Sequence, residues 1–136
     1  MTSQIFEQKP KQEALKCPFC GNHAKLVGGD AIYPHRPDLF AKRFYLCESC
    51  DAYVGCHGNT VIPLGTLANE PLRRARNRAH TAFDPLWKLG EMRRGDAYGW
   101  LAEKLGISKK ETHIALFTET QCLDVVNAVR ERKAQP

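Results

Sequence analysis

The sequence predicts an α+β fold in which a small β module, a basic helix and a short C-terminal helical bundle follow one another. Two Cys-x-x-Cys pairs, Cys17 with Cys20 and Cys47 with Cys50, mark the β module. After Pro63, short alternating segments give way to helical apolar spacing and helix-capping residues. The predicted segments are a polar lead-in over 1–15, the cysteine module over 16–64, the basic helix and its link over 65–94, and a helical segment over 95–136.

The composition is that of an ordinary globular protein. The chain has 136 residues, 43% of them hydrophobic, and a formal net charge of +5, so a modest core is expected and wholesale disorder is not. The first 16 residues contain no apolar stretch of the kind that a signal peptide needs. No run approaches the roughly 18 apolar residues of a membrane-spanning helix. We therefore expect a cytoplasmic protein with reduced cysteines.

The two cysteine pairs carry the strongest signal in the sequence. Each pair has the spacing of a tight turn that places two sulfurs on one side of a tetrahedral Zn²⁺. Gly21 suits the left-handed residue that closes such a turn, whereas Asp51 adopts that conformation less readily. Four thiolates leave no position open for water, so we expect a structural zinc in a zinc-ribbon-like module. Two disulfides, or a redox dithiol, are the alternative interpretations.

Strands are expected on either side of the cysteine turns. A weakly alternating segment precedes the turn signal Gly28-Gly29-Asp30, and a returning strand is expected directly after this turn. Two further segments of strand type lead into and out of the second cysteine pair. The expected strands are 23–27, 31–33, 43–46 and 52–54, with a proline-rich loop over 34–38.

The helix expected over 69–84 is strongly basic. Asn69 fits an N-cap, Pro71 fits the first turn, and Pro85 ends the helix. Between 71 and 94 there are seven Lys or Arg against two acids, a segment charge of +5, while the rest of the chain sums to zero. Such a helix could meet phosphates, although an ordinary solvated face is the alternative. The candidate nucleic-acid contacts are Arg73, Arg74, Arg76 and Arg78.

Three short helices are expected after the link. Gly106 closes the first, over 96–105, as a left-handed residue. Capping-box spacing opens the second and the third. The capping pairs are Ser108 with Glu111 and Thr118 with Gln121. Residues 101–108 also resemble the first helix and turn of a helix-turn-helix, but Thr112 departs from its pattern, and a plain helical hairpin explains the same residues.

Other residues with metal or catalytic chemistry have weaker signals. Cys56 and His57 follow the second cysteine pair closely and form a candidate second metal site, with His35 or His80 as a further ligand. We favour the alternative of a buried strand-end cysteine beside a loop histidine. His80 and Asp84 lie one helical turn apart, but no nucleophile motif or acid cluster accompanies them. No catalytic residue is therefore assigned, and an enzyme is not expected.

Three functions are compatible with these features. The first is a nucleic-acid-binding accessory protein whose basic helix contacts DNA or RNA. The second is a protein-binding adaptor or an inhibitor of a host enzyme, anchored through Trp87, Trp100 or Phe117. The third, and the least expected, is a metal-dependent nuclease. Neither a membrane nor a small-molecule substrate is inferred as a partner.

Several motifs together resemble a known family. They are Cys17-Pro-Phe-Cys20-Gly21, Tyr33-Pro-His-Arg-Pro-Asp38, Phe44-Tyr-Leu-Cys47, Ala52-Tyr-Val-Gly-Cys56-His57, Pro63-Leu-Gly-Thr-Leu-Ala-Asn69 and Leu72-Arg-Arg-Ala-Arg76. The resemblance, which extends over 17 to about 126, is to the zinc-finger-containing domain family of small phage and prophage proteins. It implies a zinc-binding phage or prophage protein in the bacterial cytoplasm, and it implies no catalytic residue. Asp51 stands where such a family more often has glycine.

Overall fold

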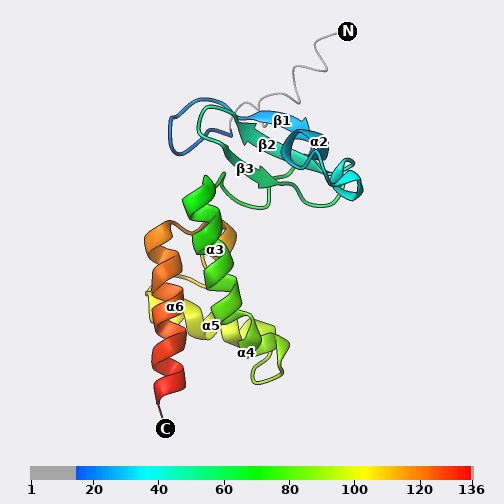
Figure 1. Ribbon diagram of the computed structural model, residues 1–136. Helices are drawn as coiled ribbons and strands as arrows, with labels where there is room; N and C mark the ends of the chain where they lie inside the picture. Colours follow the sequence, from blue (N-terminus) through cyan, green and yellow to red (C-terminus); the bar gives the residue numbers. More distant parts are fainter. Residues whose placement is uncertain (1–14, 136) are drawn as a thin grey trace. The chain divides into compact units, whose positions relative to one another are not determined.

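The computed structural model describes residues 15–135 (Figure 1). The lead-in expected over 1–15 lies outside the described residues except for Leu15. The chain divides between Glu70 and Pro71 into two compact units, here called the sheet unit and the helical unit. A three-stranded sheet forms the first, and most of the helices form the second. The predicted α+β class is therefore confirmed.

The sheet unit is an antiparallel sheet with the strand order β1-β2-β3. Its strands are β1 (Lys25–Gly28), β2 (Arg43–Cys47) and β3 (Ala52–Gly55), so three of the expected strands are confirmed within two residues. Cys47 lies opposite Ala52 in the β2–β3 pairing. Because side chains alternate between the faces of a strand, Tyr45 and Cys47 point to one face, where they pack with Cys17 in a buried core.

The strand expected over 31–33 is wrong. Residues Gly29–Ile32 form a short helix, α2, and the 3-10 helix η1 follows over Pro37–Leu39. Gly29 is buried, and a Cβ at this position would lie 1.7 Å from the carbonyl oxygen of Leu39. This close backbone packing requires glycine and holds the chain in a compact loop. The strand that returns beside β1 is therefore β2.

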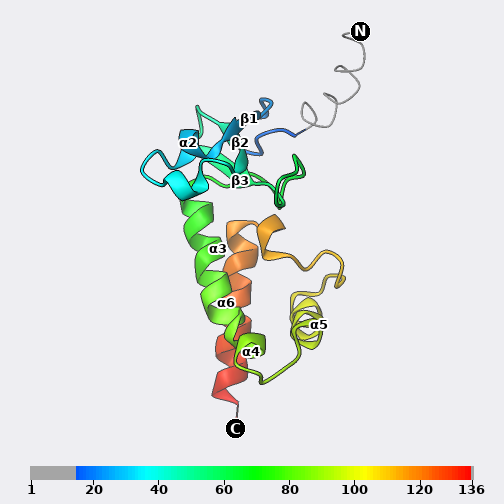
Figure 2. The same cartoon turned by 90° about the vertical axis from the view of Figure 1, so that its right-hand side faces the viewer.

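The helical unit is built from α3 (Glu70–Phe83), α4 (Pro85–Lys88), α5 (Arg94–Leu105) and α6 (Glu119–Ala134). Helices α3 and α6 lie side by side in both views (Figure 1 and Figure 2). Phe83, Leu101 and Val125 are fully buried in the core that these helices share. Two expected helix ends are confirmed: Gly106 closes α5 with a φ of 70°, and Thr118 opens α6 in a capping box with Gln121. Among residues 15–135, none of the helices is long and apolar enough to cross a membrane.

The helix expected to open at Ser108 does not form. The backbone N–H of Glu111 donates to the Ser108 hydroxyl at 3.2 Å, as in a capping box. However, the Thr112 hydroxyl donates to the Ser108 carbonyl at 2.7 Å, and the chain becomes extended at His113 before the 3-10 helix η2 (Ile114–Leu116). Neither a helix-turn-helix nor a helical hairpin is therefore present at this place, because the local cap is not followed by an α-helix.

Candidate functional site

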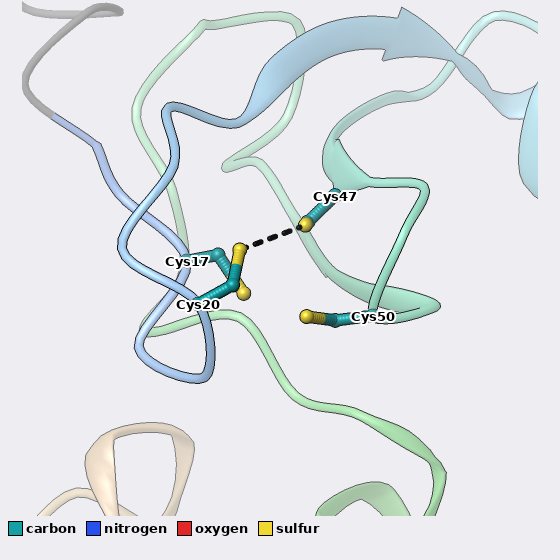
Figure 3. A group of neighbouring side chains, drawn as sticks. All are labelled: Cys17, Cys20, Cys47 and Cys50. Carbon is teal, nitrogen blue, oxygen red and sulfur yellow. Dashed lines mark hydrogen bonds between the residues drawn. The ribbon is translucent and has the colours of Figure 1, made fainter.

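The four predicted zinc ligands lie together in the sheet unit. The Sγ atoms of Cys17, Cys20, Cys47 and Cys50 all lie within 4.8 Å of one another. The first pair comes from the turn before β1, while Cys47 ends β2 and Cys50 lies in the turn to β3. Figure 3 shows the four side chains pointing toward a common centre, with the Sγ atoms of Cys20 and Cys47 3.6 Å apart.

This geometry fits a tetrahedral zinc ion. Sulfurs at Zn–S distances near 2.3 Å lie about 3.8 Å apart along the edges of a tetrahedron. The observed upper limit of 4.8 Å and the 3.6 Å pair bracket that value, so the side chains need only small adjustments to close on the ion. Thiolates are the ligands that structural zinc prefers, and four of them saturate it. The site is therefore a structural zinc site with four cysteine ligands.

Local backbone geometry forms each cysteine turn. Gly21 has a φ of 80°, and its N–H donates to the carbonyl of Cys17 at 2.8 Å. Asp51 occupies the matching position of the second turn with a φ of 51°, and its N–H donates to the carbonyl of Glu48 at 3.3 Å. A left-handed aspartate is more strained than a glycine. Both residues that follow the cysteine pairs are therefore left-handed, as the sequence predicted for a zinc-binding turn.

The thiols of the site differ in acidity. A hydrogen bond from the Ser49 hydroxyl, at 3.4 Å, is the main cause that lowers the pKa of Cys47 to about 6. Desolvation has the opposite effect on Cys50, whose pKa is raised to about 12, and burial also raises the pKa of Cys17. At neutral pH a thiolate at Cys47 is thus available to an incoming ion, and binding then releases the protons of the other thiols. Sequence reasoning missed Ser49, although it lies inside the second Cys-x-x-Cys turn.

Comparison with known families agrees with this geometry. The zinc-finger-containing domain family matches residues 13–132, which include both cysteine pairs and most of the chain. The chain belongs to this family. No curated protein and no solved structure matches it. The site of this zinc-finger-containing domain is thus defined by its own four cysteines and the turns that hold them.

The candidate second metal pair lies apart from the zinc ligands. Among residues 15–135, the four cysteines above are the one group of three or more Cys, His, Asp or Glu side chains close enough to hold a metal ion. Cys56 is half-buried against the core of the sheet unit, and burial raises its pKa. His57 is exposed beside it. The cysteine after β3 is thus half-buried, where the sequence predicts a buried one, and it stands beside an exposed loop histidine.

The four candidate arginines of α3 have different environments. Arg74 and Arg78 are exposed, and Arg73 is half-buried. Arg76 is only 9% exposed, and its Nε and one terminal nitrogen donate to the carbonyl of Phe117 at 3.1 and 3.0 Å. Burial lowers the pKa of Arg76. We therefore no longer count Arg76 among the expected phosphate contacts. Its guanidinium instead holds α3 to the segment before α6.

Replacement of Arg76 should separate stability from binding. We expect Arg76→Ala to lower the free energy of unfolding by about 2–3 kcal/mol, because it removes charged donors and leaves the Phe117 carbonyl unpaired. The exposed neighbour Arg78 is the matched control, and Arg78→Ala should change stability by less than about 0.5 kcal/mol. Urea unfolding followed by circular dichroism measures both. Equal stability of the two variants would contradict the structural role of Arg76.

The aromatic residues expected to anchor a protein partner are largely covered. Phe117 is buried in the core of the helical unit. Trp87 and Trp100 are half-buried, and the guanidinium groups of Arg94 and Arg132 lie over their rings at 5.2 and 5.6 Å. These rings therefore make intramolecular contacts.

The His80–Asp84 pair on the same unit is a local contact of α3. The Nδ1 atom of His80 lies 3.2 Å from the carboxylate of Asp84. Lys88 Nζ is 3.8 Å from the same carboxylate. His80 and Asp84 thus interact through a hydrogen bond between side chains one helical turn apart.

Proposed function

We propose that this zinc-finger-containing domain is a nucleic-acid-binding accessory protein of a phage or prophage, acting in the bacterial cytoplasm. In this proposal the zinc ion stabilises the sheet unit, and arginines of α3 contact phosphates. The concentration of exposed positive charge on α3 is the observation that supports it best. The motifs that resemble small phage proteins support the proposed origin, and the thiolate zinc site fits a reducing compartment.

The charge balance around α3 supports phosphate binding. Residues 71–94 contain seven Lys or Arg and two acids. Both acids already have cationic partners: Asp84 lies beside Lys88, and Glu91 pairs with Arg132. The segment 71–94 keeps a net charge of +5. Arginine is well suited to phosphate because its planar guanidinium can donate two parallel hydrogen bonds.

Salt dependence tests this proposal directly. If Arg73, Arg74 and Arg78 each neutralise one phosphate, affinity should fall roughly 40-fold for a duplex, or roughly 20-fold for a single strand, between about 50 and about 200 mM salt. Fluorescence anisotropy with labelled DNA and RNA of mixed sequence measures this dependence. We also expect the nucleic acid to stay intact in the presence of Mg²⁺ or Mn²⁺, because the proposed role is binding without catalysis.

A matched pair of double variants controls for net charge. The variant Arg74→Gln/Arg78→Gln should make the slope of log affinity against log salt shallower, by the amount expected for the loss of about two phosphate contacts. The control Lys109→Gln/Lys110→Gln removes the same charge from exposed positions outside α3 and should leave the slope nearly unchanged. Absence of binding at about 50 mM salt would contradict the proposal. An equal loss of affinity in both double variants would show that binding depends on the net charge of the protein and not on the arginines of α3.

A further inference from the structure

A groove runs between α3 and α6 on the surface of the helical unit. It consists of two hollows of about 500 and 360 Å³ that share Arg78, Val126 and Arg130 among their lining residues. Along α6 the lining extends from Glu119 to Lys133. At 1.5 Å per residue, that stretch is about 21 Å long, which corresponds to about four turns of a helical ligand. We call this feature the α3–α6 groove.

Aliphatic side chains line much of the α3–α6 groove. Val126 and Ala82 are half-buried between the two helices, and Val129 lies beneath them in the core. Leu123 is 58% exposed at one end. On α6 the positions 119, 123, 126, 130 and 133 follow the spacing of one helical stripe, in which Leu123 and Val126 are the apolar members. An apolar strip of this kind between two helices can receive the apolar face of a helical ligand.

Three cations border the aliphatic surface. Arg78 from α3 and Arg130 and Lys133 from α6 are all exposed, and none of their side chains makes a hydrogen bond or an ion pair with any residue of 15–135. Among the lining residues, Glu119 is the one acid, and it lies at the N-terminal end of α6. The groove therefore combines an apolar strip with a positive border, and a ligand that matches it needs apolar side chains flanked by carboxylates.

The same features argue against two other occupants. A second copy that used the same groove in a two-fold contact would bring six cations together with only two acids, the Glu119 side chains of the two copies. For nucleic acid, single-stranded binding surfaces use aromatic rings on which bases stack, and none of the residues lining the groove is aromatic. The carboxylate of Glu119 would also repel a phosphate.

We propose that the α3–α6 groove binds an acidic amphipathic helix of a partner protein. The apolar side of that helix, with anchors spaced i, i+3/i+4 and i+7, covers Leu123 and Val126. Its Asp or Glu residues pair with Arg130, Lys133 and Arg78. This goes beyond the proposed function, because the ligand is a protein segment. Arg78 is shared with the proposed phosphate contacts, so the test uses residues of α6.

Selection from a peptide library tests the chemistry of the ligand. The full zinc-loaded protein is used to select from displayed random peptides of about 16 residues, which is long enough for four helical turns. We expect enrichment of sequences with apolar residues at helical spacing and acidic residues on the flanks. The best peptide is then measured by fluorescence anisotropy. An enriched set without acidic residues, or no enrichment, would overturn the proposal.

Three variants locate the binding. Arg130→Glu/Lys133→Glu should weaken binding of the selected peptide by at least about tenfold, and Val126→Glu should do the same. The matched control Lys109→Glu/Lys110→Glu, with the same net charge change outside the groove, should bind like the unaltered protein. A version of the selected peptide with Lys in place of its acidic residues should bind the Arg130→Glu/Lys133→Glu protein more tightly than the unaltered protein. Unchanged affinity in the groove variants would overturn the proposal, as would a dimer that Val126→Glu dissociates.

Discussion

Removal of zinc by a chelator is expected to unfold the sheet unit and to leave the helical unit folded. The core of the sheet unit is small, and two of its buried members, Cys17 and Cys47, are themselves zinc ligands. Modules of this size rarely fold without a metal or disulfide staple, and structural zinc binding contributes about 10–16 kcal/mol in comparable peptides. The measurement is a ¹H–¹⁵N correlation spectrum, in which dispersed signals of β1–β3 should collapse while those of α5 and α6 persist.

Two serine variants make the same test without a chelator. Cys50→Ser removes one ligand and should abolish stoichiometric zinc together with the dispersed signals of the sheet. Cys56→Ser is the control, because Cys56 lies in the same unit but outside the ligand group. It should retain one zinc per chain. A Cys50→Ser protein that keeps both its zinc and its sheet would show that the other three thiols suffice and that the four-ligand account is wrong.

The reciprocal experiment removes a core residue of the helical unit. Phe83 is fully buried, and its ring packs edge-on against Tyr98 with the ring centroids 4.8 Å apart. We expect Phe83→Ala to lower the free energy of unfolding of this unit by about 3–5 kcal/mol, because it leaves a large cavity and removes an aromatic contact. Thermal and urea unfolding followed at helical wavelengths measure the loss. Zinc content should not change, because the zinc ligands belong to the other unit.

A surface substitution on the same unit gives the control for Phe83. Leu89 is 82% exposed, so Leu89→Ala should change stability by less than about 0.5 kcal/mol. If Phe83→Ala were as mild as Leu89→Ala, the helical unit would not depend on the core described for it. If Phe83→Ala released zinc, the two units would not be independent in stability.

Features set by a few neighbouring residues could be predicted from the sequence. The spacing within the cysteine pairs and the residues that follow them identified the zinc ligands and their left-handed turns. The glycine after α5 and the Thr118–Gln121 pair identified two helix ends in the same way. In each case the deciding interaction lies within one turn of the chain, so its physical cause is visible in the sequence.

Features set by distant contacts could not be predicted. Gly29 looked like part of a hairpin turn, but the carbonyl of Leu39, ten residues later, determines why it must be glycine. Arg76 looked like a phosphate contact, but its partner is the carbonyl of Phe117. The capping hydrogen bond between Glu111 and Ser108 is present, yet the Thr112 hydroxyl donates to the Ser108 carbonyl and no α-helix follows. The α3–α6 groove likewise exists only after two distant helices pack side by side.

The metal content and thiol state of the native protein test the central claim most directly. Native mass spectrometry should show one zinc per chain, and denaturation should release it and give the mass of a chain with every cysteine reduced. Zinc binding by Cys17, Cys20, Cys47 and Cys50 requires that result, because a ligand must be a free thiolate. A chain without metal, whose mass is lower by the hydrogens lost in disulfide formation, would contradict the account.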